Sequence, residues 1–473
     1  MKKVEIAVIG SGIGGSMIAS LNQKKDLILF EKDKNLGGCA STFKRFGEFF
    51  NTGATTFVGY DENHVIKKIF DEVGLKPDLI ESHVAIRTIQ NKKIVDRVEN
   101  FEEFLSNLNS VYYHENNRIF WKTIKDIDEK FWRLRKIYFS KYSFKAYAKT
   151  ALFIAELFKE FGFLLFKTAN GYINEVLPNI SKEYKAFIDS QLLITLQTTS
   201  KDLSLLAMSL GLSYPFHKVY YSNGGMGKIV EDLLKEVNVQ KKEEIISIER
   251  FEDKYKIIST KDEYIASKII LNSTIFESSK LFLDEDIKRY YEKFSFNDQS
   301  AFVVYLKLNS KENFLHHYQI ILKENIPNCI SNSFFVSFSD KNDEKLSKDG
   351  YSITISTHIK ALFWQNLSEI EYEEKKEFTK NYIINQFLNN FENIKFEDIK
   401  ISFCATSKTF NRYINRLNCG GKAITIKNLT ELPSCNTPFK GLYNIGDTVF
   451  AGQGWPGIAI GVNVLNKELN ANS

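Results

Sequence analysis

A glycine-rich hexapeptide near the N-terminus has the spacing of a loop that holds a pyrophosphate. The sequence GSGIGG occupies residues 10–15. Its first glycine, Gly10, permits a tight turn, Gly12 lets a phosphate approach the backbone, and Gly15 lets a helix pack closely on a strand. The free N–H groups and partial positive charge at the start of that helix favour an anion. Glu31 follows at the separation of about 20 residues where an acid accepts hydrogen bonds from ribose hydroxyls. The segment therefore predicts a dinucleotide site.

Two further segments of small residues decide between NAD and FAD. They read LGGCASTF at residues 36–43 and NTGATTF at residues 51–57. In this arrangement the sequence resembles flavoproteins of the glutathione-reductase type, in which such segments run along the pyrophosphate and the flavin. A dehydrogenase that binds only NAD has no need of them. FAD is therefore the predicted cofactor.

The C-terminal part carries a second set of residues that suit a flavin. The sequence GLYNIGDT at residues 441–448 predicts a strand that ends in Gly-Asp. Gly446 would allow close approach of the cofactor, and Asp447 would bond to hydroxyls on its ribityl or pyrophosphate side. Pro456 and Gly457 suit the start of a helix. The N-terminus of that helix, placed near the flavin, would stabilise the anionic reduced ring.

Taken with a central segment, these ends resemble one family. The sequence YYSNGGMGK lies at residues 220–228, before an expected helix over residues 229–237, and TSKTFNRYINR lies at residues 406–416. With the Gly-Asp strand, the pattern resembles the phytoene desaturase and carotenoid isomerase family, which includes relatives of retinol saturase. The resemblance spans the whole chain. It implies an FAD-dependent oxidoreductase that acts on C–C bonds of a hydrophobic, isoprenoid or carotenoid-like substrate, by desaturation, saturation or cis-trans isomerisation.

The chain departs from the family pattern at several positions. Ser222-Asn223 stands where Pro-Val is usual, and Ser407 and Ala451 each replace a proline. Asn51 replaces the usual aspartate, which puts an acid role at that position in doubt.

The resemblance also assigns two residues by position. Ile245 would lie in the strand whose backbone contacts the adenine, and Asn272 would end the strand that returns to the cofactor domain. The predicted cofactor-binding residues are Gly10, Gly12, Ile13, Gly14, Gly15, Glu31, Lys32, Gly38, Ser41, Thr42, Gly53, Ala54, Thr55, Ile245, Asn272, Gly446, Asp447, Gly454, Pro456, Gly457 and Ile458. No catalytic residue is predicted, because flavin chemistry needs mainly an oriented apolar site.

The elements that position these residues follow the order of an interrupted Rossmann unit. Residues 4–9 predict a strand, residues 13–22 a helix and residues 26–30 a second strand, which is the length of one βαβ unit. A mainly helical block is expected over residues 98–206, and alternating runs within residues 300–360 predict a sheet. The predicted class is α/β, with a Rossmann-type FAD-binding domain of the glutathione-reductase type and an inserted α+β substrate domain. The FAD-binding domain would comprise residues 1–75, 207–290 and 395–473, and the substrate domain, which faces the membrane, residues 76–206 and 291–394.

Composition narrows the range of partners and compartments. The net charge is only +5, without a dense basic stripe, so no nucleic-acid partner is expected. The 5 cysteines have no CxxC spacing and the 7 histidines no metal-like spacing, so neither a metal site nor a disulfide framework is predicted. No uncharged apolar stretch reaches the roughly 18 residues of a spanning helix. The expected location is cytoplasmic, with peripheral attachment to the inner face of the membrane as a further expectation.

One segment has the composition of a membrane-surface helix. Residues 130–167 interleave lysine and arginine with Phe, Tyr and Trp and contain few acids. Such a pattern suits docking on an anionic bilayer, where the segment would open a tunnel to the flavin. A pair of core-packed helices with a solvated lysine face is the alternative.

Two other functions stay open at this point. The first is an amine-oxidase-like flavoenzyme acting on a soluble amine, although amine oxidases usually carry Gly-Glu where this chain has Gly446-Asp447. The second is a prenyl-binding carrier of the same fold, like the Rab GDP-dissociation inhibitors. Such carriers have lost the flavin, and the intact glycine loop argues against that class.

Overall fold

The chain begins with a parallel strand–helix–strand unit. β1 (Lys2–Ile9) and β2 (Leu27–Glu31) pair in parallel with Ile6 opposite Leu27, and α1 (Ile13–Leu21) connects them. The paired ends of both strands are apolar and buried, as expected for strands covered on both faces. The computed structural model describes residues 1–134, 136–295, 298–420 and 432–471.

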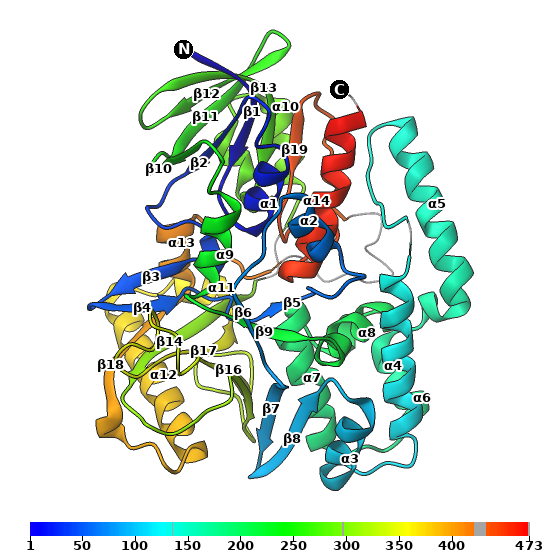
Figure 1. The fold of residues 1–473 in the computed structure, drawn as a ribbon, viewed down its shortest axis with the longest axis vertical. Coiled ribbons are helices and arrows are strands. Elements are labelled where there is room, and N and C mark those ends of the chain that lie inside the picture. The colour runs from blue at the N-terminus through cyan, green and yellow to red at the C-terminus, as the bar shows by residue number, and fades with distance from the viewer. Residues whose placement is uncertain (135, 296–297, 421–431, 472–473) are drawn as a thin grey trace.

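A sheet of seven strands is built around this unit, in the upper half of Figure 1. Its other strands are β10 (Val239–Lys241), β11 (Ile245–Phe251), β12 (Lys254–Ser259), β13 (Glu263–Leu271) and β19 (Leu442–Asn444). The strand order is β10-β2-β1-β13-β12-β11, and β19 pairs with β13. The strands β1, β2, β10, β13 and β19 are parallel, whereas β11, β12 and β13 form an antiparallel meander. Around the sheet lie α2 (Val65–Glu72), α9 (Met226–Leu233), α10 (Glu285–Glu292) and α14 (Gly454–Ala471).

A second sheet of seven strands lies below the first. It consists of β7 (Val84–Gln90), β8 (Lys93–Val98), β14 (Ser300–Leu308), β15 (His317–Ile321), β16 (Ser333–Phe338), β17 (Tyr351–Ile359) and β18 (Ile399–Ala405). The order is β18-β14-β17-β16-β15-β7-β8, and its pairs are antiparallel except β7 with β15. The long helix α12 (Glu369–Asn390) buries Ile383, Ile384 and Phe387 against it.

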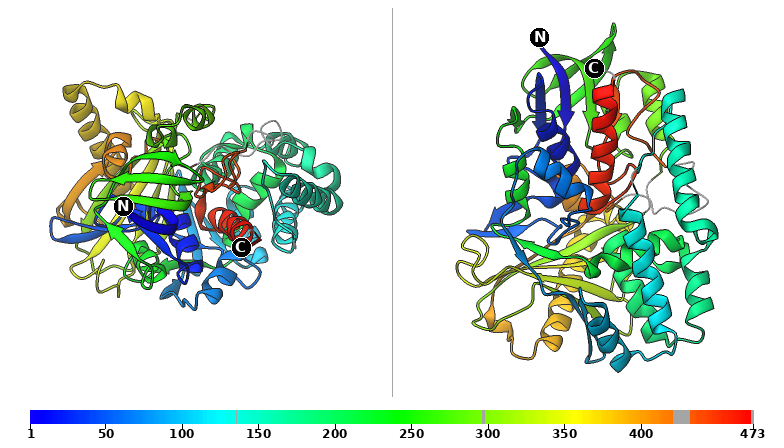
Figure 2. Two further views of the ribbon diagram at one scale, coloured as in Figure 1. Left: turned by 90° about the horizontal axis from the view of Figure 1, so that it is seen from above. Right: turned by 45° about the vertical axis from the view of Figure 1, so that its right-hand side comes forward.

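The remaining chain forms a helical block and several short connecting elements. The block comprises α3 (Phe101–Val111), α4 (Asn117–Trp132), α5 (Phe144–Phe161), α6 (Ala169–Val176), α7 (Lys182–Leu196) and α8 (Leu205–Ser213). Two views show α5 as its outermost helix (Figures 1 and 2). The connecting elements are the hairpin β3 (Thr42–Arg45) and β4 (Glu48–Asn51), the three strands β5 (Phe57–Val58), β6 (Leu79–Glu81) and β9 (Val219–Ser222), and the helices α11 (Ala361–Gln365) and α13 (Ser407–Ile414).

The predicted α/β class and Rossmann-type start are confirmed. The expected helical block is also present, but the pair β7–β8 precedes it and joins the sheet that later residues form. Among the residues described, no helix combines the length and apolar character needed to cross a bilayer.

Candidate functional site

The loop between β1 and α1 has the shape that a phosphate cradle requires. Gly10 adopts a φ of +99°, which an L side chain rarely tolerates. A Cβ added to Gly15 would lie 2.1 Å from the carbonyl oxygen of Gly10, so only glycine allows α1 to approach β1 this closely. Gly12 is the N-cap of α1 and carries no side chain, so the first N–H groups of the helix are left to a ligand. The loop therefore fits the pyrophosphate of a dinucleotide.

Asn272 joins this loop to the C-terminal Gly-Asp turn. It follows β13, donates its backbone N–H to Ile9 O at 2.9 Å, and directs its amide Nδ2 to Gly10 O at 3.2 Å. A Cβ on Gly12 would lie 2.7 Å from Asn272 Nδ2, and a Cβ on Gly446 would lie 3.2 Å from Asn272 Oδ1. The two predicted halves of the site, far apart in sequence, thus meet at one side chain.

The same convergence shows at Gly14. A Cβ there would lie 2.7 Å from Asn272 Oδ1 and 3.1 Å from the backbone nitrogen of Gly446. Ile13, the first residue of α1, lies beside it. The start of α1 and the end of β19 are therefore in direct contact.

Glu31 is the last residue of β2 and lies against the same loop. Its Oε2 accepts hydrogen bonds from Ser11 N at 3.0 Å and Ser11 Oγ at 2.5 Å, and its Oε1 accepts one from Asp33 N at 2.9 Å. A carboxylate has about four acceptor positions, so capacity remains for ribose hydroxyls. The Lys32 amino group is engaged elsewhere. It donates a hydrogen bond to Asn415 Oδ1 at 2.5 Å and forms an ion pair with Glu244 at 3.2 Å.

Ile245 lies close to this acid. It begins β11, and Glu243, two residues earlier, donates its N–H to Glu31 O at 2.9 Å. Its own side chain is buried.

The segments after β2 fold back over the loop. A Cβ on Gly38 would lie 3.9 Å from Gly12 Cα, so this turn faces the first glycine loop. Ala54 N donates to Cys39 O at 3.0 Å, and a Cβ on Gly53 would lie 3.7 Å from the same oxygen. The hydroxyl groups of Ser41 and Thr52 form a hydrogen bond of 2.6 Å, and those of Thr55 and Ser337 form another of 2.6 Å. The second of these bonds ties the segment at residues 51–57 to strand β16 of the lower sheet.

Asn51 has a structural role. Its Oδ1 accepts hydrogen bonds from Thr42 Oγ1 and Met226 N, both at 3.0 Å, and Thr42 Oγ1 in turn accepts one from Gly227 N at 3.0 Å. A Cβ on Gly225 would lie 2.4 Å from Thr42 Oγ1. The GGMG segment therefore needs its glycines to pack α9 against the β3–β4 hairpin, and an amide at position 51 satisfies that contact.

Asp447 forms a partly buried ion pair with Arg416 that the sequence did not predict. Arg416 Nη2 lies 2.6 Å from Asp447 Oδ2 and Nη1 lies 3.2 Å from Oδ1, and these side chains are only 13% and 19% exposed. Burial alone would lower the pKa of Arg416, but the Asp447 carboxylate outweighs that effect and raises it. Burial raises the pKa of the neighbouring Cys39 and Cys419 thiols, which therefore remain protonated at neutral pH.

The start of α14 packs between the two halves of the fold. The helix begins at Gly454, as Pro456 and Gly457 predicted, and Ile458 is buried. A Cβ on Gly59 would lie 2.8 Å from Pro456 Cγ. The N-terminus of α14 is thereby held beside the segment that follows β5.

The lower sheet supplies polar side chains close to the predicted flavin segments. His317 Nε2 lies 3.1 Å from Thr56 Oγ1, and its Nδ1 lies 3.2 Å from Ala85 O. Burial lowers the pKa of His317 to about 3, so the ring is neutral at physiological pH. His317 and Thr56 are 261 residues apart in the chain, so no local sequence pattern could predict this contact.

Comparisons with known proteins agree with this geometry. A profile for an NAD(P)-binding Rossmann-like domain matches residues 8–73. The chloroplastic prolycopene isomerase of Daucus carota is 24% identical over 486 aligned residues, which cover 96% of this chain and 78% of the isomerase. The all-trans-retinol 13,14-reductase of Danio rerio is 24% identical over 49% of this chain and 39% of the reductase.

Solved structures share the fold over the whole chain. An oxidoreductase from Methanosarcina mazei has a TM-score of 0.66 at 16% identity and covers 98% of this chain and 100% of its own. A putrescine oxidase variant has a TM-score of 0.64 at 12% identity, with 99% of each chain covered. The expected resemblance to carotenoid isomerases and desaturases is confirmed, and these relatives support the assignment of the chain as an oxidoreductase.

Proposed function

We propose that the protein binds FAD and acts on C–C bonds of a hydrophobic isoprenoid or carotenoid-like substrate by desaturation, saturation or cis-trans isomerisation. The observation that carries this proposal is the meeting of the glycine loop and the Gly446 turn at Asn272. The substrate class follows from the two relatives named for prolycopene and retinol, of which the isomerase aligns along most of both chains.

The chain's own groups would hold the cofactor in a fixed orientation. Residues 10–15 and the start of α1 would bind the pyrophosphate, and Glu31 would accept hydrogen bonds from the ribose hydroxyls. Asp447, held in place by Arg416, would bind hydroxyls near the flavin. The bound FAD would supply hydride acceptance or donation at a C–C bond. The remaining proposed contacts are those of the predicted set other than Lys32, whose amino group is engaged by Asn415 and Glu244.

The same proposal divides the chain between two domains. The upper sheet and its helices would form the FAD-binding domain from residues 1–75, 207–290 and 395–473. The lower sheet and the helical block would form the substrate domain from residues 76–206 and 291–394. Thr55 and Ser337, whose hydroxyl groups form a hydrogen bond of 2.6 Å, would then lie where the two domains meet.

The proposal is tested by turnover of a polyene by the FAD-loaded protein. Under anaerobic conditions with reduced FAD, we expect a cis-configured carotenoid or retinoid to change its double-bond geometry or saturation, as followed by its absorption spectrum and mass. The same reaction with heat-denatured protein measures any conversion that free reduced flavin causes by itself. Oxidation of putrescine or cyclohexylamine with no effect on any polyene would contradict the proposal and favour the amine-oxidase alternative. A colourless protein that retains bound lipid would favour the carrier.

Exposed aromatic side chains on α5 and the turn after it favour attachment to an anionic membrane surface. Phe144 is 91% exposed and Phe163 82%, and Tyr147, Leu152, Phe158 and Phe166 are also exposed. Lys145 and Lys159 are exposed among them. Buried rings elsewhere on the same helix, such as Phe153, pack into the core. The helix therefore has one apolar face that packs on the protein. Its opposite face exposes aromatic rings and lysine side chains to solvent.

Flotation with vesicles tests this attachment. Wild-type protein is expected to float with vesicles that contain phosphatidylserine, and a Phe144→Ser, Phe163→Ser variant is expected to lose at least about tenfold in partitioning, since each ring contributes about 1.5–3 kcal/mol of apolar burial. Lys149 is a poor target because it pairs with Glu468 at 3.2 Å. Phe396→Ser, at an exposed ring in the short turn before β18 and outside α5, is the matched control. Equal flotation of the double variant and the control would contradict membrane docking by α5.

A further inference from the structure

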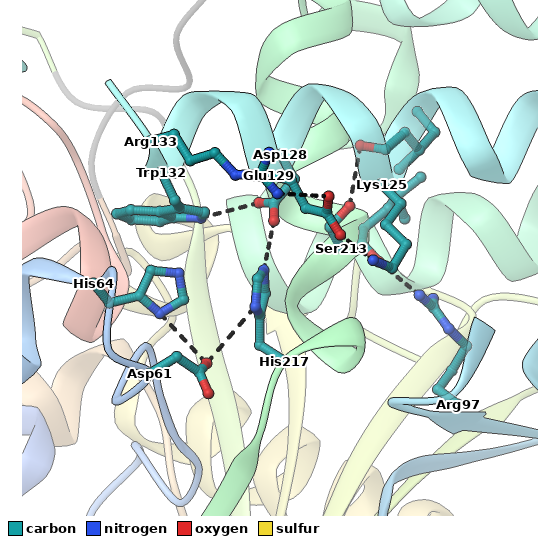
Figure 3. A network of polar contacts seen from close by, with 12 residues as sticks. Asp61, His64, Arg97, Lys125, Asp128, Glu129, Trp132, Arg133, Ser213 and His217 are labelled. Atoms are coloured by element: carbon teal, nitrogen blue, oxygen red, sulfur yellow. Dashed lines mark hydrogen bonds and ion pairs between the residues drawn. The ribbon is translucent and has the colours of Figure 1, made fainter. Parts of the chain in front are cut away.

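A cluster of imidazole and carboxylate groups lies between the loop after β5, the start of α2 and the segment before β9 (Figure 3). Asp61 follows β5, His64 is the N-cap of α2, and His217 precedes β9. Because β5 and β9 pair with Phe57 opposite Tyr220, the chain brings the three side chains together from positions far apart in sequence. The sequence predicted no metal site, since their spacing matches no known ligand pattern.

The geometry of these three groups is that of ligands around a small cation. Asp61 Oδ2 lies 3.5 Å from His64 Nδ1 and 3.7 Å from His217 Nδ1. One ligand atom from each of the three residues lies within 4.8 Å of the others. Bonds of about 2.0–2.1 Å in a tetrahedral zinc site place ligand atoms roughly 3.3–3.4 Å apart. The two shorter separations are near that value, and both exceed a normal hydrogen bond.

Two of the ligand atoms are buried and without a hydrogen bond. His64 is 3% exposed, and neither its Nδ1 nor Asp61 Oδ2 has a hydrogen-bond partner within the described ranges. Buried polar atoms are nearly always satisfied by protein, water or an ion. Both atoms face the same point, between the two histidine rings (Figure 3). A shared ligand at that point accounts for both.

A second carboxylate, that of Asp128, orients the His217 ring through its Nε2 atom. Asp128, on α4 and 2% exposed, lies 2.5 Å from His217 Nε2, and its other oxygen accepts a hydrogen bond from Trp132 Nε1 at 3.1 Å. This contact leaves His217 Nδ1 facing Asp61 and His64. Metal-bound histidines regularly donate their second N–H to a carboxylate in this way.

We propose that His64 Nδ1, His217 Nδ1 and the Asp61 carboxylate bind a divalent transition cation of the Zn²⁺ type. Three protein ligands leave a fourth position for water, and the partial exposure of Asp61 and His217 provides a way in from solvent. Two imidazoles with one carboxylate suit Zn²⁺ better than Mg²⁺ or Ca²⁺, which prefer oxygen ligands. Through Asp128, the ion would link the loop after β5 to α4 of the helical block.

Titration of the EDTA-treated, FAD-loaded protein with Co²⁺ tests the site. We expect one equivalent to bind with the visible absorption of a four-coordinate site and to be displaced by Zn²⁺. His64→Ala and Asp61→Asn should remove this signal, whereas His83→Ala, at an exposed histidine outside the cluster, should retain it. Asp128→Asn should weaken binding by about 10–100-fold, as loss of such an outer carboxylate does elsewhere.

The opposite results would overturn the proposal. They are the absence of stoichiometric Co²⁺ binding by the wild type, or equal binding by Asp61→Asn and His83→Ala. Asp61→Asn preserves side-chain size, so it remains informative if His64→Ala fails to fold. Because the readout is the metal spectrum, it is independent of flavin content and of turnover.

Discussion

Replacement of Gly15 by alanine is expected to weaken FAD binding strongly. The added Cβ would lie 2.1 Å from Gly10 O, a backbone atom that cannot move without shifting β1. The start of α1 would be pushed away from the pyrophosphate site. Loss of two backbone hydrogen bonds to a charged phosphate, at about 1.5–3 kcal/mol each, corresponds to roughly 10²–10⁴-fold weaker binding.

Fluorescence titration of the apoprotein with FAD measures this effect. Gly74→Ala is the matched control, because Gly74 has φ +71° but a Cβ there would meet no heavy atom of the described chain within 4 Å. It should lose some stability and keep its affinity for FAD. An unchanged Kd in Gly15→Ala would show that the loop does not hold the nucleotide.

Asp447→Ala is expected to lower both stability and FAD affinity. Removing one partner of this partly buried ion pair leaves the Arg416 charge without its carboxylate and costs up to about 3 kcal/mol of unfolding free energy, at the low end of the range for fully buried pairs. If Asp447 also bonds to FAD, its loss should weaken binding roughly 10–150-fold, from about 1.5–3 kcal/mol for a charged hydrogen bond. Denaturant unfolding of the apoprotein and FAD titration measure the two effects separately.

A double variant separates the two roles of Asp447. Arg416→Met with Asp447→Ala removes the unpaired charge and should regain much of the stability, but it should not regain FAD affinity. Asp96→Ala, which breaks the Arg87–Asp96 pair on the lower sheet, is the control for general loss of an ion pair. Recovery of FAD affinity in the double variant would show that Asp447 acts only through Arg416.

Local sequence patterns predicted the elements with strong short-range signals. The loop at residues 10–15, the strand that ends at Glu31 and the helix that begins near Pro456 depend on glycine, proline and apolar runs whose effects are local. The convergence of the glycine loop and the Gly446 turn was expected from the family resemblance, because both had to serve one cofactor, but their contact through the Asn272 side chain was not.

The contacts that sequence reasoning missed depend on tertiary structure. Arg416 was noticed only as part of a motif, and its pairing with Asp447 joins α13 to the end of β19 across the fold. The strands β5 and β9 are too short for periodicity to reveal, yet their pairing brings His64 to His217. The pair β7–β8 joins a sheet whose other strands lie more than about 200 positions later in the chain, which no local pattern encodes.

The nucleotide content of the purified protein tests the central claim most directly. We expect the protein to show the absorption of oxidised flavin and, on denaturation, to release one equivalent of FAD, identified by mass. A colourless protein that neither releases FAD nor takes it up on reconstitution would contradict the account.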